Sequence, residues 1–408
     1  MRILVLNQYF HPDLASTGQL LTELCEDLSV EHDVTVVCGR PSYDPHGATS
    51  GKRRFLSRDR HGNVTVLRIW STSFPRGDIL GRLVNYATYM TSCLWGAFRA
   101  DRPDVILTMT DPPLVAAAAL VVSRVRRVPF VYICQDIIPE GAVAVGQMSE
   151  GALTRALARL NRVLRARATT VVAIGRDMKD KLVTLGTAPE KIQIIPNWAD
   201  GRAVKPLDGP SSFRAKQGWD GKFVVMHAGN VGRPQGLETL VEAAALLSGD
   251  GDVLVAVVGE GGAKPALQER VRVLGLDNVV FLPYHPKDAS SEFLGAADIH
   301  VVGLKRGLAG YAVPSKVYGI MAAGKPFIAA IEEVSEPALV VRETGCGLVV
   351  PPEDPTALAA AIRRIRGTDP AAMGAAGRIA FEERFDRPQA AAAYRRVLEE
   401  AAAQRLPT

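Results

Sequence analysis

Short apolar runs alternate with longer amphipathic segments along most of the chain. Runs such as "RILVLNQYF", "DVTVVCGR", "FVYICQD" and "TTVVAIG" are rich in Val and Ile and are typical of buried strands. Between them lie segments such as "TGQLLTELCEDLS", whose leucines recur at helical spacing. Strands that alternate with helices in this way predict a parallel, doubly wound α/β sheet.

The alternation lapses once and then restarts. The stretch at 201–220 is dominated by Gly, Pro, Ser and charged residues, which is typical of an interdomain linker. Beyond it, "KFVVMHAG", "GLETLVEAAALL" and "VLVAVVGEG" resume the pattern. We therefore expect two doubly wound, Rossmann-like domains, at 1–200 and 221–380, facing each other across a cleft. An Ala- and Arg-rich helical tail follows them.

The stretch "YAVPSKVYGIMAAGKP" places Pro314, Ser315 and Lys316 at the start of a short apolar helix. Pro suits a first helical turn, and Ser can cap the free N–H groups there. Lys316 adds a full charge at the positive end of the helix dipole, so this position suits an anion such as phosphate. An ordinary capped helix with an exposed lysine is the alternative interpretation, and this segment alone does not decide between them.

Polar and glycine residues follow other strands of the second domain. "HAGNVGRPQGLETL" is a Gly-rich turn, which permits close approach of the backbone to a ligand. "VVGEGG" places Glu260 after the next strand, and "FLPYHP" places Tyr284 and His285 after a third. Because ligands of doubly wound sheets bind beyond the carboxyl ends of the strands, these segments predict a nucleotide-diphosphate pocket.

The first domain has a matching set of strand-end residues. Gly18 opens the helix after the first strand, in a loop that also carries His11. Asp111 follows one later strand, and Asp136 and Glu140 follow another. We expect Asp136 and Glu140 to be catalytic and His11, Asp111 and Asp136 to contact the acceptor. For Asp136 the alternative is a helix-capping loop residue, and for His11 it is an ordinary loop histidine.

These segments together resemble a known family. Their order, with "RVPFVYICQDIIPE", "KIQIIPNW", "GNVGRPQGLETL", "NVVFLPY" and "VPSKVYGIMAAGKP", is similar to that of the retaining glycosyltransferases of family four, which have the GT-B fold. More narrowly, it is similar to a bacterial subgroup that builds capsule, exopolysaccharide and O-antigen units. The resemblance implies a nucleotide-sugar donor on the second domain, an acceptor on the first, and a helix at about 381–408 that crosses back to the first domain.

The chain also departs from this family. The Arg and Lys that often bind the diphosphate are replaced by Asn230 and Gln235, and two glutamates with seven residues between them are replaced by Tyr311 and Gly319. Nearby cations are expected to supply the missing charge, and Lys316 is also expected to act in catalysis. The expected donor-binding residues are Gly18, Asn230, Arg233, Gln235, Glu260, Tyr284, His285, Lys305, Arg306, Tyr311, Val313, Pro314, Ser315 and Lys316.

Composition excludes several other classes. The chain of 408 residues is 47% hydrophobic and 22% charged, as in a globular protein, and no apolar run is long enough to span a membrane. The five cysteines form no CxxC pair, and the one D-x-D, at Asp250 to Asp252, lies at the wrong end of the predicted sheet for catalysis. We expect no metal and no cofactor. The net charge of +5 suits an acidic ligand or membrane surface, but no nucleic-acid motif is present.

Two helices bear on membrane contact. No charge occurs between Arg82 and Arg99, where two tyrosines, a tryptophan and a phenylalanine suit a membrane interface, although a core helix is an equal alternative. The segment 153–167 has leucines on one stripe and arginines on the other, which suits either solvent or an anionic leaflet. We therefore expect a cytoplasmic protein, with peripheral binding to the inner membrane face as a hypothesis.

The sequence thus predicts transfer of a sugar, with retention, from a UDP-sugar to a carbohydrate acceptor. The expected donor is a UDP-N-acetylhexosamine or a related deoxy sugar, and the expected acceptor is a saccharide that is free or linked to polyprenyl diphosphate. Two alternatives remain open. One is a non-hydrolysing UDP-sugar epimerase, and the other is a non-catalytic sugar-nucleotide-binding partner.

Overall fold

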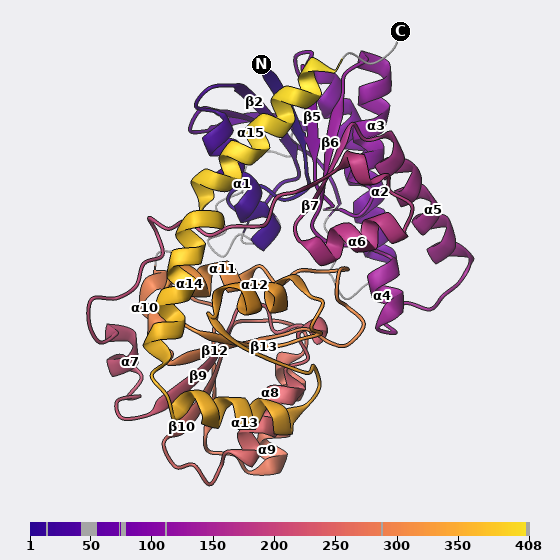
Figure 1. The fold of residues 1–408 in the computed structure, drawn as a ribbon. Coiled ribbons are helices and arrows are strands. Elements are labelled where there is room, and N and C mark those ends of the chain that lie inside the picture. The colour runs from indigo at the N-terminus through magenta and orange to yellow at the C-terminus, as the bar shows by residue number, and fades with distance from the viewer. Residues whose placement is uncertain are drawn as a thin grey trace.

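The chain folds into two α/β domains, each built on one sheet (Figure 1). The computed structural model describes residues 1–13, 15–41, 55–72, 74, 79–110, 112–286 and 289–404. Asp111, expected to contact the acceptor, lies outside these ranges. Within them, no helix is both long and apolar enough to cross a lipid bilayer.

The amino-terminal sheet has eight strands in the order β3-β4-β2-β1-β5-β6-β7-β8. All pairs are parallel except β3 with β4. The edge strand β3 ("LSRDRH") is polar and lacks the apolar alternation that predicted its neighbours, which is how natural edge strands avoid further pairing. The strands are β1 (Arg2–Leu6), β2 (Asp33–Cys38), β3 (Leu56–His61), β4 (Val64–Ile69), β5 (Val105–Thr108), β6 (Phe130–Cys134), β7 (Thr170–Ala173) and β8 (Ile192–Ile194).

Helices cover both faces of this sheet. One face packs against α2, α3, α5 and α6, and the other packs against α1 and the distant helix α15. The short helix α4 follows β6 and reaches toward the second domain. The helices are α1 (Ser16–Leu28), α2 (Ile79–Arg99), α3 (Val115–Arg126), α4 (Glu140–Ala144), α5 (Ala152–Arg167), α6 (Arg176–Thr184) and a 3₁₀ turn η1 (Pro189–Lys191).

The carboxy-terminal sheet is wholly parallel, in the order β11-β10-β9-β12-β13-β14. Its strands are mostly apolar, as expected for a sheet that is buried on both faces, although β9 and β12 each contain one buried histidine. The strands are β9 (Phe223–Ala228), β10 (Val253–Val258), β11 (Val279–Leu282), β12 (Ile299–Gly303), β13 (Phe327–Ala330) and β14 (Gly347–Val350).

Two helical layers enclose this second sheet. One layer contains α8, α9 and α13, and the other contains α10, α11, α12 and α14. The helices are η2 (Arg233–Gln235), α8 (Glu238–Leu246), α9 (Lys264–Leu274), α10 (Ser290–Gly295), α11 (Lys316–Ala322), α12 (Glu336–Thr344), α13 (Pro355–Arg366) and α14 (Pro370–Arg384).

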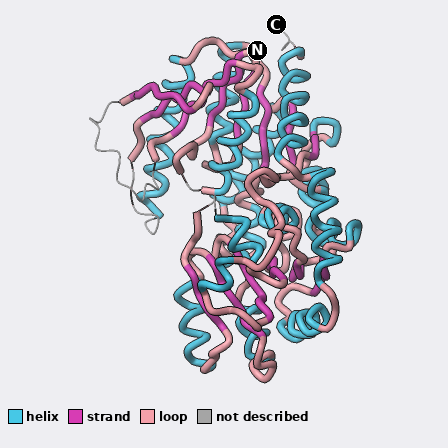
Figure 2. Tube along the Cα trace, turned by 90° about the vertical axis from the view of Figure 1, so that its left-hand side faces the viewer, coloured by secondary structure: helices cyan, strands magenta, loops and turns pink. Residues whose placement is uncertain are grey.

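The chain crosses between the domains twice. The first crossing follows β8 and contains a short helix, α7 (Ser212–Lys216), inside the segment expected to be an irregular linker. The second joins α14 to α15 (Arg387–Ala403), which returns along the outside of the amino-terminal domain (Figures 1 and 2). The two crossings meet where Gly201 N donates to Asp386 Oδ1 over 2.9 Å. Next to this contact, Arg387 at the start of α15 forms an ion pair with Asp27 of α1.

Candidate active site

Lys316 is held by a buried histidine beside a glycine turn. Its Nζ lies 3.0 Å from Nε2 of His227, which is fully buried in β9. The other ring nitrogen of His227, Nδ1, lies 3.3 Å from the carbonyl oxygen of Val301 in β12. A Cβ placed on Gly229 would lie 3.5 Å from Lys316 Nζ, so the ammonium stands against the first residue of the Gly-rich turn.

Each ring nitrogen of His227 lies near an acceptor, because Nε2 is also 3.3 Å from the carbonyl oxygen of Asn230. When Lys316 is protonated, its ammonium donates to Nε2, and Nδ1 then carries the ring proton and donates to the Val301 carbonyl. Burial, together with the neighbouring ammonium, holds the pKa of His227 well below its ordinary value. Burial also lowers the pKa of Lys316, to about 7. The pair is thus a neutral imidazole that positions a partly buried lysine, which an incoming anion would keep protonated.

Glycines let two strand-end loops touch at this point. Gly259 has φ +141°, and a Cβ there would lie 1.9 Å from the carbonyl oxygen of Gly229. A Cβ on Gly261 would lie 2.3 Å from the carbonyl oxygen of Val231. No other residue type fits such contacts, so the sequence keeps the turn after β9 and the turn after β10 in direct backbone contact.

The other predicted residues of these turns have mixed positions. Asn230 and Arg233 are exposed, whereas Gln235 is occupied within the turn, where its Oε1 accepts from Gly232 N over 3.1 Å. Glu260 is exposed and pairs with Lys264, with 2.7 Å between Oε1 and Nζ. A contact between Glu260 and a ligand would therefore compete with the ion pair between Glu260 and Lys264.

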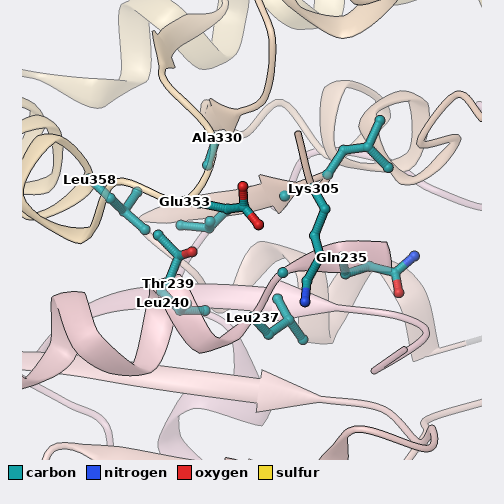
Figure 3. A pocket seen from close by; sticks show the side chains of 12 residues that line it. Gln235, Leu237, Thr239, Leu240, Lys305, Ala330, Glu353 and Leu358 are labelled. Atoms are coloured by element: carbon teal, nitrogen blue, oxygen red, sulfur yellow. The ribbon is translucent and has the colours of Figure 1, made fainter. Parts of the chain in front are cut away.

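Lys305 and Arg306 stand farther along the same sheet edge. Lys305 Nζ lies 3.7 Å from Glu238, and Arg306 donates to the carbonyl oxygen of Pro352 over 3.2 Å. Lys305 also lines a hollow of about 10 Å³ together with Gln235, room for about one water (Figure 3). This hollow lies behind the Gly-rich turn, against α8.

Tyr284 and His285 differ in exposure. The Tyr284 side chain is 45% exposed at the end of β11. The His285 ring packs edge-on against Phe213, with 4.9 Å between ring centroids, and lies 5.8 Å from the Phe293 ring. Its Nε2 is enclosed without a partner in the described part of the chain. The His285 side chain therefore belongs to an aromatic cluster with α7 and α10.

The segment before α11 faces both domains. Val313 is buried in the core of the amino-terminal domain, and the Tyr311 ring lies beneath Lys181 Nζ, 4.5 Å from the ring centroid. Pro314 and Ser315 precede the helix as expected, but the expected Ser315 side-chain cap is not formed, because its φ and ψ of −70° and −16° are already helical. The phosphate-binding hypothesis thus depends on Lys316 more than on Ser315.

Asp136 and Glu140 lie where the domains meet. Asp136 forms a backbone bridge with Ala312, and Ile137 N donates to the Tyr311 carbonyl over 2.9 Å. Both carboxylate oxygens of Glu140 are enclosed, and among the described residues neither accepts a hydrogen bond. Buried carboxylate oxygens are stabilised by hydrogen-bond donors, which a bound hydroxyl group would supply here.

Asp136 also lines a hollow of about 10 Å³ that reaches into the amino-terminal domain. Asn161 and Arg165 of α5 line the same hollow and are almost fully buried. Asn161 donates to the Ile138 carbonyl over 2.5 Å, and its Oδ1 has no partner in the described ranges. We call this the Asp136 hollow.

His11 and Gly18 lie in the loop and first helix after β1. The His11 ring stacks on His61 with 4.1 Å between centroids, and its pKa is lowered by burial and then by His61 and Arg68. A Cβ placed on Gly18 would lie 3.2 Å from the Cβ of Tyr9, so glycine lets α1 approach this loop closely. Both residues are on the expected side of the domain, but the His11 ring is directed at β3.

A separate set of contacts closes the domains against each other. Arg176 at the start of α6 binds Glu336 at the start of α12, with 3.0 Å between Nη2 and Oε1. Beside it, Gly310 N donates to Asp177 Oδ2 over 3.1 Å, and burial raises the pKa of Asp177 to about 6. We call these four residues the interdomain latch.

The D-x-D motif lies in the turn between α8 and β10, at the amino end of the strand. Asp250 pairs with Arg363 and Asp252 with Arg366, both on α13. No group of three or more His, Cys, Asp or Glu side chains in the described part of the chain is placed to hold a metal. Metal independence itself stays a prediction.

His227 is a site residue that the strand interpretation of "KFVVMHAG" missed. A signal for it exists, because this histidine interrupts an otherwise apolar buried run directly before the Gly-rich turn. Asn161, Arg165 and the latch residues lie on helices whose inner faces depend on tertiary packing. No local pattern identifies them.

The two halves of the chain match two models of one enzyme class. Residues 17–198 match a glycosyl transferase 4-like domain, and residues 222–367 match glycosyl transferases group 1. The probable glycosyltransferase WbjE of Pseudomonas aeruginosa is 33% identical over 299 residues, which cover 70% of this chain and 72% of WbjE. The putative colanic acid biosynthesis glycosyl transferase WcaI of Escherichia coli is 27% identical over 374 residues, covering 89% and 92%.

Solved structures agree in fold. Anabaena Alr3699/HepE in complex with UDP and glucose superposes with a TM-score of 0.74 at 19% identity, covering 98% of this chain and 100% of that one. WaaG, a glycosyltransferase involved in lipopolysaccharide biosynthesis, gives 0.68 at 17% identity, covering 98% and 99%. With its two matched domains and this shared architecture, the chain belongs to the family-four-like glycosyltransferases of the GT-B fold.

Proposed function

We propose that this glycosyltransferase uses a UDP-sugar, with the diphosphate bound at Lys316. The observation that carries the proposal is the Lys316 ammonium held between His227 and Gly229 at the carboxyl edge of the parallel sheet. The UDP complexes of HepE support a uridine nucleotide. A UDP-N-acetylhexosamine or a related deoxy sugar is the proposed donor.

In this mechanism the leaving group is a nucleoside diphosphate, whose departure requires positive potential. Lys316 supplies the nearest charge, with Arg233 on the exposed side of the turn. We propose retention of configuration, with the departing phosphate oxygen taking the acceptor proton. Asp136 orients the acceptor. Glu140, whose carboxylate oxygens are enclosed in the structure, accepts a hydrogen bond from an acceptor hydroxyl. No cofactor enters the reaction.

The proposed acceptor is a saccharide linked to polyprenyl diphosphate, in bacterial cell-surface polysaccharide biosynthesis. The name of WcaI, a putative colanic acid biosynthesis glycosyl transferase, supports the role in polysaccharide biosynthesis. The acceptor enters on the amino-terminal domain, at the side that carries Asp136. The enzyme works in the cytoplasm at the inner face of the membrane, as a peripheral protein.

The first test is calorimetric titration with UDP and GDP, each with EDTA and with Mg²⁺. Wild type should bind UDP in EDTA, and Lys316→Ala should lose roughly 10- to 150-fold, as expected for about 1.5–3 kcal/mol from a charged hydrogen bond. Lys222→Ala is the matched control, because Lys222 binds the Gly251 carbonyl at the opposite sheet edge. Equal affinities in both variants would refute a diphosphate site at Lys316.

Product analysis then separates the alternative activities. A glycosyltransferase releases UDP only when an acceptor is present and forms a glycosylated product. An epimerase needs no acceptor and returns an intact nucleotide sugar. Binding without any turnover, across a panel of lipid-linked acceptors, would favour a non-catalytic partner.

A further inference from the structure

Three neighbouring helices of the amino-terminal domain contain no acidic residue. α2, α3 and α5 carry nine arginines and no Asp or Glu. They pack on one face of the sheet, where α3 contacts both α2 and α5. Nine arginines exceed the formal net charge of +5, so the rest of the chain is net acidic. The three helices therefore account for the net positive charge of the protein, although Arg165 among these arginines is buried.

The outward side of α2 is apolar and uncharged for four turns. Surface helices normally direct charged residues to solvent. Here the Trp95 side chain is 37% exposed and that of Phe98 40%. The exposed positions recur three or four residues apart, so they form one stripe: Val84, Ala87, Thr91, Trp95 and Phe98.

α3 and α5 extend this apolar stripe across the same face. Val125 on α3 is 67% exposed, and Leu153 on α5 is 65% exposed. Leu160 and Val163 are exposed about two and three turns farther along α5. The leucine stripe predicted for this helix is therefore only partly a core-facing surface. Large apolar side chains gathered on adjacent helices indicate an interaction surface.

The exposed arginines of this face are not ion-paired within the part of the chain that the structure describes. In the carboxy-terminal domain several exposed arginines are paired, as Arg270 is with Glu242 and Arg272 with Glu269. On α2, α3 and α5, by contrast, no exposed arginine lies within ion-pair distance of a carboxylate in the described ranges. These arginines are Arg99, Arg124, Arg155, Arg159, Arg162 and Arg167.

We infer that the outer face of α2, α3 and α5 binds the surface of an anionic lipid bilayer. Unpaired arginines attract acidic headgroups, and exposed Trp, Phe, Leu and Val insert among the upper acyl carbons. The guanidinium of Arg99 lies 4.8 Å above the Trp95 ring, which joins both functions at one point. A second copy of the chain is the weaker occupant, because it would bring two strongly basic faces together.

This surface lies next to the proposed acceptor site. The inner side of α5 carries Asn161 and Arg165, which line the Asp136 hollow, while its outer side carries Leu153 and Leu160. One helix thus connects the bilayer-facing surface to the residue proposed to orient the acceptor. The role of this surface rests on the proposed lipid-linked acceptor, because binding to the bilayer would bring the enzyme to that acceptor. Binding to the bilayer itself needs no substrate.

Flotation with lipid vesicles tests the surface without nucleotide or acceptor. Wild type should bind vesicles of phosphatidylcholine with phosphatidylglycerol at low salt, should be released at high salt, and should ignore phosphatidylcholine alone. The double variant Arg155→Gln/Arg159→Gln should lose about 30-fold in partition, since each basic residue near the surface is worth about fivefold. Arg270→Gln/Arg272→Gln, two exposed helix arginines of the other domain, should leave partition unchanged.

Trp95→Ser gives a second variant that keeps the charge. It should weaken binding to the acidic vesicles even at low salt. Three results would overturn the inference: no binding to acidic vesicles, equal losses in the two double variants, or a dimer that buries this face and leaves vesicles unbound. Turnover is measured separately with a water-soluble acceptor, so that failure of the proposed reaction can be distinguished from failure of membrane binding.

Discussion

At the scale of the residue, the chemistry of the site depends on how one ammonium is held. Lys316 stands within 3.0 Å of a histidine that is itself fixed by a backbone carbonyl. Burial gives Lys316 a pKa of about 7, so the free enzyme holds it at the edge of deprotonation. A bound diphosphate favours the charged form and raises that pKa, because opposite charges stabilise each other.

Nucleotide binding should therefore depend on pH. Below about pH 7 Lys316 is already protonated and UDP affinity is at its full value. As pH rises through the lysine pKa, binding must take up a proton, so affinity should fall up to about tenfold per pH unit between about pH 7 and 9. Calorimetry in buffers of different ionisation enthalpy measures the proton uptake directly.

Two variants make this prediction sharp. Lys316→Arg keeps a group that stays protonated, so the decline in affinity should disappear. His227→Leu removes the acceptor of the ammonium, which should lower the lysine pKa and move the decline to lower pH. An unchanged decline in Lys316→Arg would assign the titration to another group.

At the scale of the element, the Gly-rich turn after β9 is held in place by the turn after β10. The contact is between backbones, and Gly259 stands at its centre with a positive φ. A side chain at this position would separate the two turns and carry the backbone of Gly229 away from Lys316. The turn that approaches a ligand is thus shaped by a glycine in a different strand-end loop.

Gly259→Ala should accordingly destabilise the fold and weaken UDP binding together. Both the positive φ and the 1.9 Å clash oppose a Cβ, and a cost of about 2–4 kcal/mol is expected for such a position. Gly262→Ala, in the same loop but with open space around it, should be nearly neutral. Urea unfolding and UDP titration on both variants measure the difference. Equal stability in the two would contradict the packing argument.

Elements also show what the sequence could predict. Buried strands, the two-domain plan and the helix after Pro314 follow from apolar runs and turn residues, because these act locally. The antiparallel strand β3 and the helix α7 were not predicted, since "LSRDRH" has no apolar alternation and α7 lies in a Gly- and Pro-rich stretch. Ser315 has the residue type of a cap, but neighbouring contacts set its backbone angles.

At the scale of the whole molecule, the interdomain latch and the two chain crossings hold the domains together. Glu336 accepts from both the backbone N–H and the guanidinium of Arg176, and its side chain is only 3% exposed. None of this was visible in the sequence, since Arg176 and Glu336 are 160 residues apart and each looks like an ordinary first-turn residue. The contact between His227 and Lys316 was likewise not predictable, because the two residues are 89 positions apart.

Removing the latch should open the molecule. Arg176→Ala leaves the Glu336 carboxylate enclosed without its cation, and about 1–2 kcal/mol of interdomain free energy should be lost, less than for a fully buried pair because Arg176 is partly exposed. Small-angle scattering should then report a larger radius of gyration. Arg342 lies on the same helix as Glu336 and forms an exposed pair with Glu333, which precedes the helix; Arg342→Ala breaks this pair and should leave the radius of gyration unchanged.

The return of α15 to the amino-terminal domain has a consequence for synthesis. Tyr394, Val397, Leu398 and Ala401 complete one of the two cores of that domain, in which Ile3 of the first strand is also buried. During translation, the first strand is synthesised early and α15 is synthesised after both sheets. The first domain to emerge must therefore wait, with one face of its sheet covered by α1 but not yet by α15, until the second domain has been translated and α15 has left the exit tunnel. The later domain is the one that can finish folding first.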